Sequence, residues 1–142
     1  MKIHIITIGE PKLAYAKVGW QDYLGRLRHY HDVRITHVAD KNNKPKHILD
    51  AIGKAYAVAL AIDGKQYSSH ELANFIEFRS GQGGEVAFLI GGPDGLQPEV
   101  LAASTQQLSF SKLTFPHDLA MVILVEALYR ASTIVAGQPY HR

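Results

Sequence analysis

The sequence predicts an α/β protein whose mostly parallel sheet is flanked by helices. Two observations support this fold class. Segments of strand and helix character alternate along the 142 residues, and the inner strand segments are apolar on both faces, as in parallel sheets covered on both sides. The length fits one domain, which we expect to span residues 1–142.

The first half of the chain predicts two strands and two helices. Residues 2–8 (KIHIITI) alternate and are rich in β-branched side chains, which predicts a strand, and residues 32–38 (DVRITHV) predict a second. Between them, Pro11 opens an amphipathic helix that runs to about Tyr30. After a polar loop, residues 46–53 predict a short helix that ends at a glycine.

The middle of the chain predicts a strand, a turn and a helix. Residues 55–62 (AYAVALAI) are almost continuously apolar, so this strand is expected to be buried on both faces. Residues 63–69 (DGKQYSS) have the composition of a turn. Ser68 or Ser69 is expected to cap a helix that reaches about Arg79.

The remaining residues predict two more strands and two more helices. Residues 84–90 (GEVAFLI) form another buried strand, Pro98 opens a short helix, and residues 107–111 (QLSFS) form the last strand. Asp118 is expected to cap a helix that runs to about Val135.

Three of these strands end in loops that suit a binding site. In parallel sheets, ligands bind in the crevice beyond the carboxyl ends of the strands. The loops that follow such ends here are residues 60–65, 90–96 and 109–117.

The second of these loops, within FLIGGPDGL, is rich in glycine. A turn explains Pro93, Asp94 and Gly95, because Gly95 can supply a positive φ. Gly91 and Gly92 are left over, and bare backbone there indicates the close approach of a ligand or of another backbone. The spacing matches neither the dinucleotide fingerprint nor the P-loop.

The third loop, within LSFSKLTFPH, combines hydroxyl and apolar side chains. Ser109 and Ser111 either satisfy backbone groups or belong to a pocket whose free amides and apolar walls suit a flat heterocycle such as adenine. His117 precedes a helix, whose N-terminus disfavours an imidazolium. It is therefore either a neutral acceptor or base, or a structural group that bonds the turn.

Composition excludes several classes of site. The sequence has no cysteine, which removes disulfides, thiolate zinc sites and cysteine nucleophiles. His29 and His31 have the wrong spacing for a shared metal, so we expect none. The longest apolar run, residues 119–125, is too short to cross a membrane. With a net charge of +2 and no secretory leader, the chain is expected to be cytoplasmic.

The final predicted helix is apolar nearly all round, which indicates burial on every side. A chain this small would supply that burial as a homodimer. Glu126 and Arg130 are spaced i, i+4 on this helix and are expected to be buried and directed at a ligand. Beyond it, Tyr140, His141 and Arg142 offer a stacking face, a titratable group and a phosphate-binding fork, a set that suits contact with RNA.

The segments FLIGGPDGL, LSFSKLTFPH, EALYRA and PYHR, with the opening KIHIITIG, together resemble the ribosomal large-subunit methyltransferase H family of the SPOUT class. The resemblance covers essentially the whole chain. It implies a C-terminal trefoil knot, which general rules of chain topology disfavour. It also implies a homodimer that binds S-adenosylmethionine in the knot and methylates N3 of pseudouridine 1915 in 23S ribosomal RNA of the assembled ribosome. The cofactor residues that it implies are Leu60, Gly91, Gly92, Ser111, Lys112, Leu113, Thr114, Phe115 and Pro116.

Methyl transfer to an imide nitrogen requires in-line positioning and gains from a proton acceptor. We expect the acceptor to be His141, reaching the site of the other subunit, or His117. Arg130 and Arg142 are expected to hold RNA phosphate. Tyr140 is expected to stack on a base or to close the pocket.

Two alternatives stand beside this reading. Members of the family commonly have an arginine where this chain has Met121, which leaves open a non-catalytic dimeric ribosome-binding protein that kept the SPOUT fold. The other alternative is a nucleotide-binding enzyme of the dehydrogenase kind, but TIGEPKLA lacks the later glycines of that fingerprint.

Overall fold

The computed structural model describes all of residues 1–142 and contains one five-stranded sheet with the strand order β2-β1-β4-β3-β5. Every pair of neighbouring strands is parallel, which confirms the predicted α/β fold. The strands are β1 (Lys2–Ile8), β2 (Asp32–Val38), β3 (Tyr56–Gln66), β4 (Glu85–Ile90) and β5 (Gln106–Ser109).

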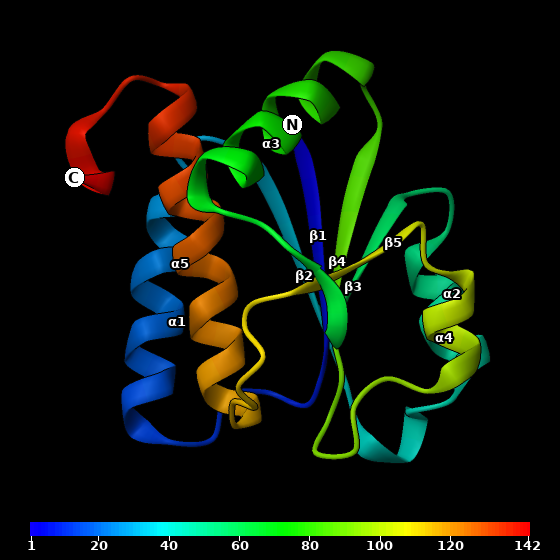
Figure 1. The fold of residues 1–142 in the computed structure, drawn as a ribbon. Helices are drawn as coiled ribbons and strands as arrows, with labels where there is room; N and C mark the ends of the chain where they lie inside the picture. Colours follow the sequence, from blue (N-terminus) through cyan, green and yellow to red (C-terminus); the bar gives the residue numbers. More distant parts are fainter.

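Helices cover both faces of the sheet (Figure 1). One face carries α1 (Ala14–Leu27), α3 (Ser69–Gln82) and α5 (His117–Val135), and the other carries α2 (Pro45–Ile52) and α4 (Pro98–Ala103). Short 3₁₀ helices, η1 (Asp40–Asn42) and η2 (Pro139–His141), complete the chain. No helix is long and apolar enough to cross a membrane.

The sheet separates two apolar cores. Ile3 and Ile5 of β1 pack into the core beneath α1, α3 and α5, whereas Ile6 and Ile8 pack into the smaller core beneath α2 and α4. Since successive side chains of a strand point to opposite faces, a central parallel strand must be apolar on both. This is why the inner strands could be recognised from sequence.

The predicted turn at residues 63–69 is wrong, because β3 continues to Gln66. Leu60 and Lys65 both pair with Leu108 of β5, so residues 61–64 bulge out of the ladder between two registers. A Cβ at Gly64 would lie 2.7 Å from the backbone of Gln107 and Leu108. The absence of a side chain at Gly64 therefore lets the last residues of β3 lie against β5.

Two helix starts also differ from expectation. Helix α1 begins at Ala14 rather than at Pro11. Helix α5 begins at His117 with Pro116 as its N-cap, and the Asp118 side chain makes no cap hydrogen bond. By contrast, Ser68 caps α3 as predicted, in a capping box with Glu71.

Candidate functional site

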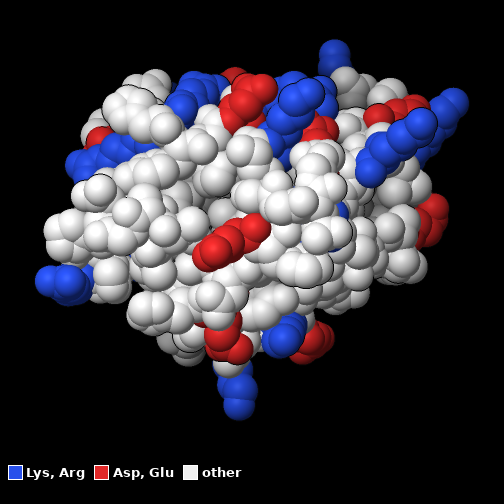
Figure 2. All heavy atoms as spheres, turned by 90° about the horizontal axis from the view of Figure 1, so that it is seen from above, with Lys and Arg blue, Asp and Glu red and all other residues white.

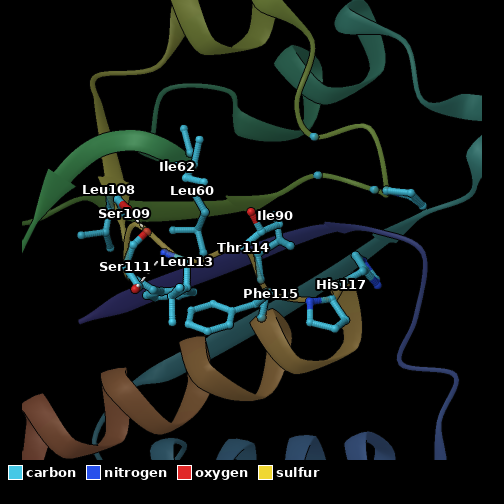
Figure 3. Close-up of a pocket in the computed structure, with 18 residues that line it drawn as sticks. Leu60, Ile62, Ile90, Leu108, Ser109, Ser111, Leu113, Thr114, Phe115 and His117 are labelled. Atoms are coloured by element: carbon cyan, nitrogen blue, oxygen red, sulfur yellow. Dashed lines mark hydrogen bonds between the residues drawn. The ribbon is translucent and has the colours of Figure 1, made fainter.

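A pocket of about 600 Å³ opens beyond the carboxyl ends of β3, β4 and β5 (Figure 3). Because these strands are neighbours in the sheet, the loops that follow them meet at one edge. The pocket is formed by the three loops expected from sequence, together with the first turn of α5.

Most of the expected cofactor residues line this pocket. They are Leu60, Gly91, Gly92, Ser111, Leu113, Thr114, Phe115 and Pro116. Lys112 does not line it and is exposed. His117 does line it, and Figure 3 shows its ring beyond Phe115, at the start of α5.

Sequence reasoning missed several lining residues, of which Ile62 is the most informative. Ile62 lies on the bulge of β3, is 52% exposed to solvent and lines the pocket. The tight fit of Gly64 against β5 fixes this bulge. In the sequence, the available signal for this bulge was Gly64, an isolated glycine within the segment that forms β3.

Close packing of backbone within the turn explains part of its glycine content. A Cβ at Gly91 would lie 2.4 Å from the carbonyl carbon of Gly95, so another backbone segment explains this glycine. A Cβ at Gly92 would approach the Ile8 side chain at 3.3 Å. Gly95 has a φ of 77°, as the predicted turn requires, and its amide donates to the Gly92 carbonyl at 2.9 Å.

The loop between β5 and α5 offers free backbone donors. The Ser109 hydroxyl donates to the Ser111 carbonyl at 2.8 Å, and the Leu113 amide donates to the Ser111 hydroxyl at 3.0 Å. The amides of Ser111, Lys112, Thr114 and Phe115 have no protein acceptor. Together with the apolar walls, these amides suit a ligand that carries both a flat apolar group and hydrogen-bond acceptors.

His117 and Asp118 connect the pocket to the loop between β1 and α1. His117 Nδ1 lies 3.4 Å from Asp118 Oδ1, and Asp118 Oδ2 accepts from the amides of Lys12 (2.8 Å) and Leu13 (2.6 Å). Burial by itself would raise the pKa of Asp118, but these two amides and His117 outweigh it, and the pKa is lowered. Asp118 is therefore held as a carboxylate.

The remaining predicted site residues gather elsewhere, around Tyr140. The ring of Tyr140 meets Tyr129 edge-on, with 4.6 Å between ring centroids, and the Arg130 guanidinium lies 4.9 Å from the centre of the Tyr140 ring. Arg130 Nε donates to Glu126 Oε1 at 2.7 Å. His141 packs against His70 of α3, with 5.5 Å between ring centroids. Burial raises the pKa of Tyr140, so the phenol stays protonated.

This cluster is remote from the pocket of its own chain. The pocket lies at the first turn of α5, whereas η2 follows the last turn (Figure 1). An α-helix rises 1.5 Å per residue, so the 19 residues of α5 separate the two ends by about 27 Å. None of Arg130, Tyr140 and His141 lines the pocket.

The outer surface of α1 and α5 is apolar and uncovered. Val18 and Tyr15 of α1 are 69% and 53% exposed. Leu119, Val122 and Ile123 of α5 are only partly buried, so the expectation of burial on every side is not met within one chain. Gly19 lets the two helices pack closely, because a Cβ there would lie 3.1 Å from Val122.

Figure 2 shows the face at the top of Figure 1, which carries α3 and η2. Lysine and arginine side chains lie along its edges, with acidic side chains between them, and uncharged atoms fill most of the area. This face has no continuous basic patch of the kind that binds naked RNA.

The chain resembles known proteins over its full length. The family described as "Predicted SPOUT methyltransferase" matches residues 1–141. The ribosomal RNA large subunit methyltransferase H of Deinococcus radiodurans is 49% identical, over 100% of this chain and 99% of that protein. The protein of the same name from Bacillus pumilus is 40% identical, over 100% of each chain.

Solved structures share the fold at low sequence identity. The tRNA (m1G37) methyltransferase of Aquifex aeolicus superposes with a TM-score of 0.62 at 11% identity, covering 99% of this chain and 73% of that one. A probable methylase family protein from Haemophilus influenzae gives 0.63 at 12% identity, covering 99% and 70%.

Proposed function

The chain belongs to the SPOUT methyltransferase family, and from that premise we propose that it methylates N3 of pseudouridine 1915 in 23S ribosomal RNA of the assembled ribosome. Full-length relatives named ribosomal RNA large subunit methyltransferase H support large-subunit ribosomal RNA as the substrate class. The single observation that carries the proposal is the pocket, which places the motif-matched residues together at one edge of the sheet. In this proposal residues 1–142 act as one methyltransferase domain, with the trefoil knot of the family after β4.

The pocket fits S-adenosylmethionine as cofactor. Its volume of about 600 Å³ lies in the range of pockets for small ligands. The free amides of Ser111, Thr114 and Phe115 would donate hydrogen bonds to acceptor atoms of the adenine and the ribose. Leu60 and Leu113 would cover the apolar face of the ring. When bound, the cofactor supplies an activated methyl group on a sulfonium sulfur, and the products are N3-methylpseudouridine, S-adenosylhomocysteine and a proton.

The protein residues position the imide and take up its proton. His117 lines the pocket, so its imidazole is a candidate general base for a ligand that binds there. His141 is the second candidate, and it can act only on the pocket of another subunit, because α5 separates it from its own. Of the two, only His117 lines the pocket of its own chain.

We propose that a second copy of this chain covers the apolar surface of α1 and α5. A two-fold dimer buries the same surface on both subunits. If the two α5 helices run antiparallel across it, the η2 of one subunit comes to the end of α5 at which the partner's pocket opens. Each site would then combine the pocket of one chain with His141 and Arg142 of the other.

The cluster around Tyr140 would hold this segment in place for its partner. Tyr140 is packed against Tyr129 and Arg130, and in this proposal it anchors η2. Arg130 donates a hydrogen bond from Nε to Glu126, and its two terminal guanidinium nitrogens have no protein acceptor. Arg130 and Arg142 would offer such donors to RNA phosphate.

Calorimetry with S-adenosylmethionine and S-adenosylhomocysteine tests the cofactor assignment. Thr114 is exposed and lines the pocket, so Thr114→Trp should fill the site without disturbing the core. We expect the wild type to bind both compounds and the variant to bind neither. Ribosome binding without cofactor binding would instead indicate a non-catalytic module. Met121 gives no support to that alternative, because it is fully buried and outside the pocket.

Methyl transfer to ribosomes tests the substrate. Because the face shown in Figure 2 has no continuous basic patch, we expect the chain to recognise the shape of the ribosome and to act faster on ribosomes than on protein-free ribosomal RNA. Equal rates on the two substrates would contradict recognition of the assembled particle.

A further inference from the structure

Asp118 is the only acidic side chain among the buried residues. Its two carboxylate oxygens have different partners. Oδ2 accepts both backbone bonds, from Lys12 at 2.8 Å and from Leu13 at 2.6 Å, and so fixes the loop that leads into α1. Oδ1 makes neither of these bonds and faces Nδ1 of His117 at 3.4 Å.

The opposite nitrogen of His117 has no protein partner. His117 Nε2 is buried and makes no hydrogen bond within the chain, although its ring lines the pocket. The loop between β1 and α1 lies against the His117 ring, since a Cβ at Gly9 would lie 4.0 Å from His117 Cε1. His37 of β2 also interacts electrostatically with His117, and Glu10 interacts with His37.

We propose that Asp118 is a positioning residue that holds His117 as the Nδ1–H tautomer, so that the buried Nε2, on a ring that lines the pocket, keeps its lone pair free. A carboxylate oxygen only accepts hydrogen bonds, so the nitrogen that faces it carries the proton. In a neutral imidazole the other nitrogen is then the acceptor. The expected role of this acceptor rests on the proposed function: Nε2 accepts the proton that N3 of the base loses when its bond to the methyl carbon forms.

Asp118→Asn distinguishes the role of Oδ2, which fixes the loop before α1, from the role of Oδ1, which faces His117. Because one oxygen accepts both backbone bonds, the amide oxygen of asparagine can replace Oδ2 and keep the loop in place. The amide nitrogen then stands where Oδ1 was and can only donate. His117 Nδ1 must become the acceptor and Nε2 must carry the proton, which is the wrong tautomer for a base.

The experiment combines ¹⁵N NMR of the histidine side chains with single-turnover methylation of ribosomes. Wild-type His117 should show the Nδ1–H tautomer, and Asp118→Asn should show the Nε2–H tautomer. The methylation rate at saturating substrate should fall at least tenfold in the variant, with cofactor affinity and ribosome KM changed less than threefold. The control, Asp50→Asn, changes an exposed carboxylate on α2 and should leave the rate and the spectrum of His117 unchanged.

Three results would overturn the inference. They are an Nε2–H tautomer in the wild type, a tautomer that does not change in Asp118→Asn, or a changed tautomer with an unchanged rate and pH profile. The first is read from the wild type alone, so the inference stays testable even if the variant does not fold. If the wild type methylated no ribosomal RNA, the proposed function would fail, whereas the NMR result would still decide the tautomer.

Discussion

His117 and His141 lie at opposite ends of the region spanned by α5, one in its first turn and one in the 3₁₀ helix that follows its last turn. His117 lines the pocket and His141 packs on His70 of α3. A single chain therefore cannot bring both histidines to one ligand without unfolding η2. This separation makes the proposed site depend on two subunits.

Subunit mixing tests whether the site is shared. His141→Ala and Thr114→Trp should each be inactive as homodimers, because one lacks the contributed histidine and the other lacks a usable pocket. After equal mixing and exchange, half of the dimers are mixed and each has one complete site, so about a quarter of the wild-type activity should return. No recovery in a mixture shown to contain heterodimers would contradict a shared site.

A charge on the α1 surface should dissociate the dimer. Val18 is 69% exposed, so Val18→Asp should leave the fold of the chain intact while placing a carboxylate in the apolar contact. We expect a monomer by analytical ultracentrifugation and at least a tenfold loss of methylation.

Phe78→Asp is the matched control, because Phe78 is 62% exposed on α3, away from that surface. It should remain a dimer. If Val18→Asp were as dimeric as Phe78→Asp, the second copy would have to bind elsewhere.

The two glycines after β4 should respond differently to alanine. At Gly91 the new methyl group would collide with backbone atoms at 2.4 Å, whereas at Gly92 it would lie 3.3 Å from the Cγ2 methyl group of Ile8, which is a milder overlap. Overpacking typically costs about 1–3 kcal/mol, and we expect Gly91→Ala to reduce the free energy of unfolding in urea by at least that much. Gly92→Ala should cost less. The reverse order would mean that the turn is not packed as described.

Stability should fall in mild acid because of His31. Burial lowers the pKa of His31 to about 4, below its unfolded value of 6.5. The unfolded chain therefore binds more protons between these values, and stability is lost as the pH falls from about 6.5 towards 4. The neutral ring donates from Nε2 to Ser132 at 2.9 Å, because the Ser132 hydroxyl itself donates to the Leu128 carbonyl.

Thermal unfolding at pH 7 and pH 5 measures this effect. His31→Gln should show a smaller loss between the two pH values than the wild type, whereas His29→Gln, at an exposed position of the same turn, should behave like the wild type. An equal loss in His31→Gln and wild type would show that other groups carry the acid sensitivity.

The strands and the pocket edge were predictable because they follow from local patterns. Continuous apolar runs identified β3 and β4, and the rule for parallel sheets placed the loops that follow them together. The continuation of β3 through DGKQ was not predictable, because its pairing with β5 overrides turn-forming residues.

The roles of Asp118 and Tyr140 depend on tertiary contacts of their side chains. Asp118 has the residue type of an N-cap, but it is the second residue of α5, and its carboxylate accepts from the amide of Leu13, 105 residues earlier. Tyr140 is held by Tyr129 and Arg130, which fixes η2 on its own chain. Neither contact leaves a periodic signal in the sequence.

The most direct test of the central claim is mass spectrometry of the 23S ribosomal RNA fragment that contains pseudouridine 1915. Ribosomes lacking the modification would be incubated with S-adenosylmethionine and either the wild type or Thr114→Trp. We predict the mass increment of one methyl group on that pseudouridine, located to N3, with the wild type alone. An unmodified fragment, or a methyl group on another nucleotide, would contradict the account.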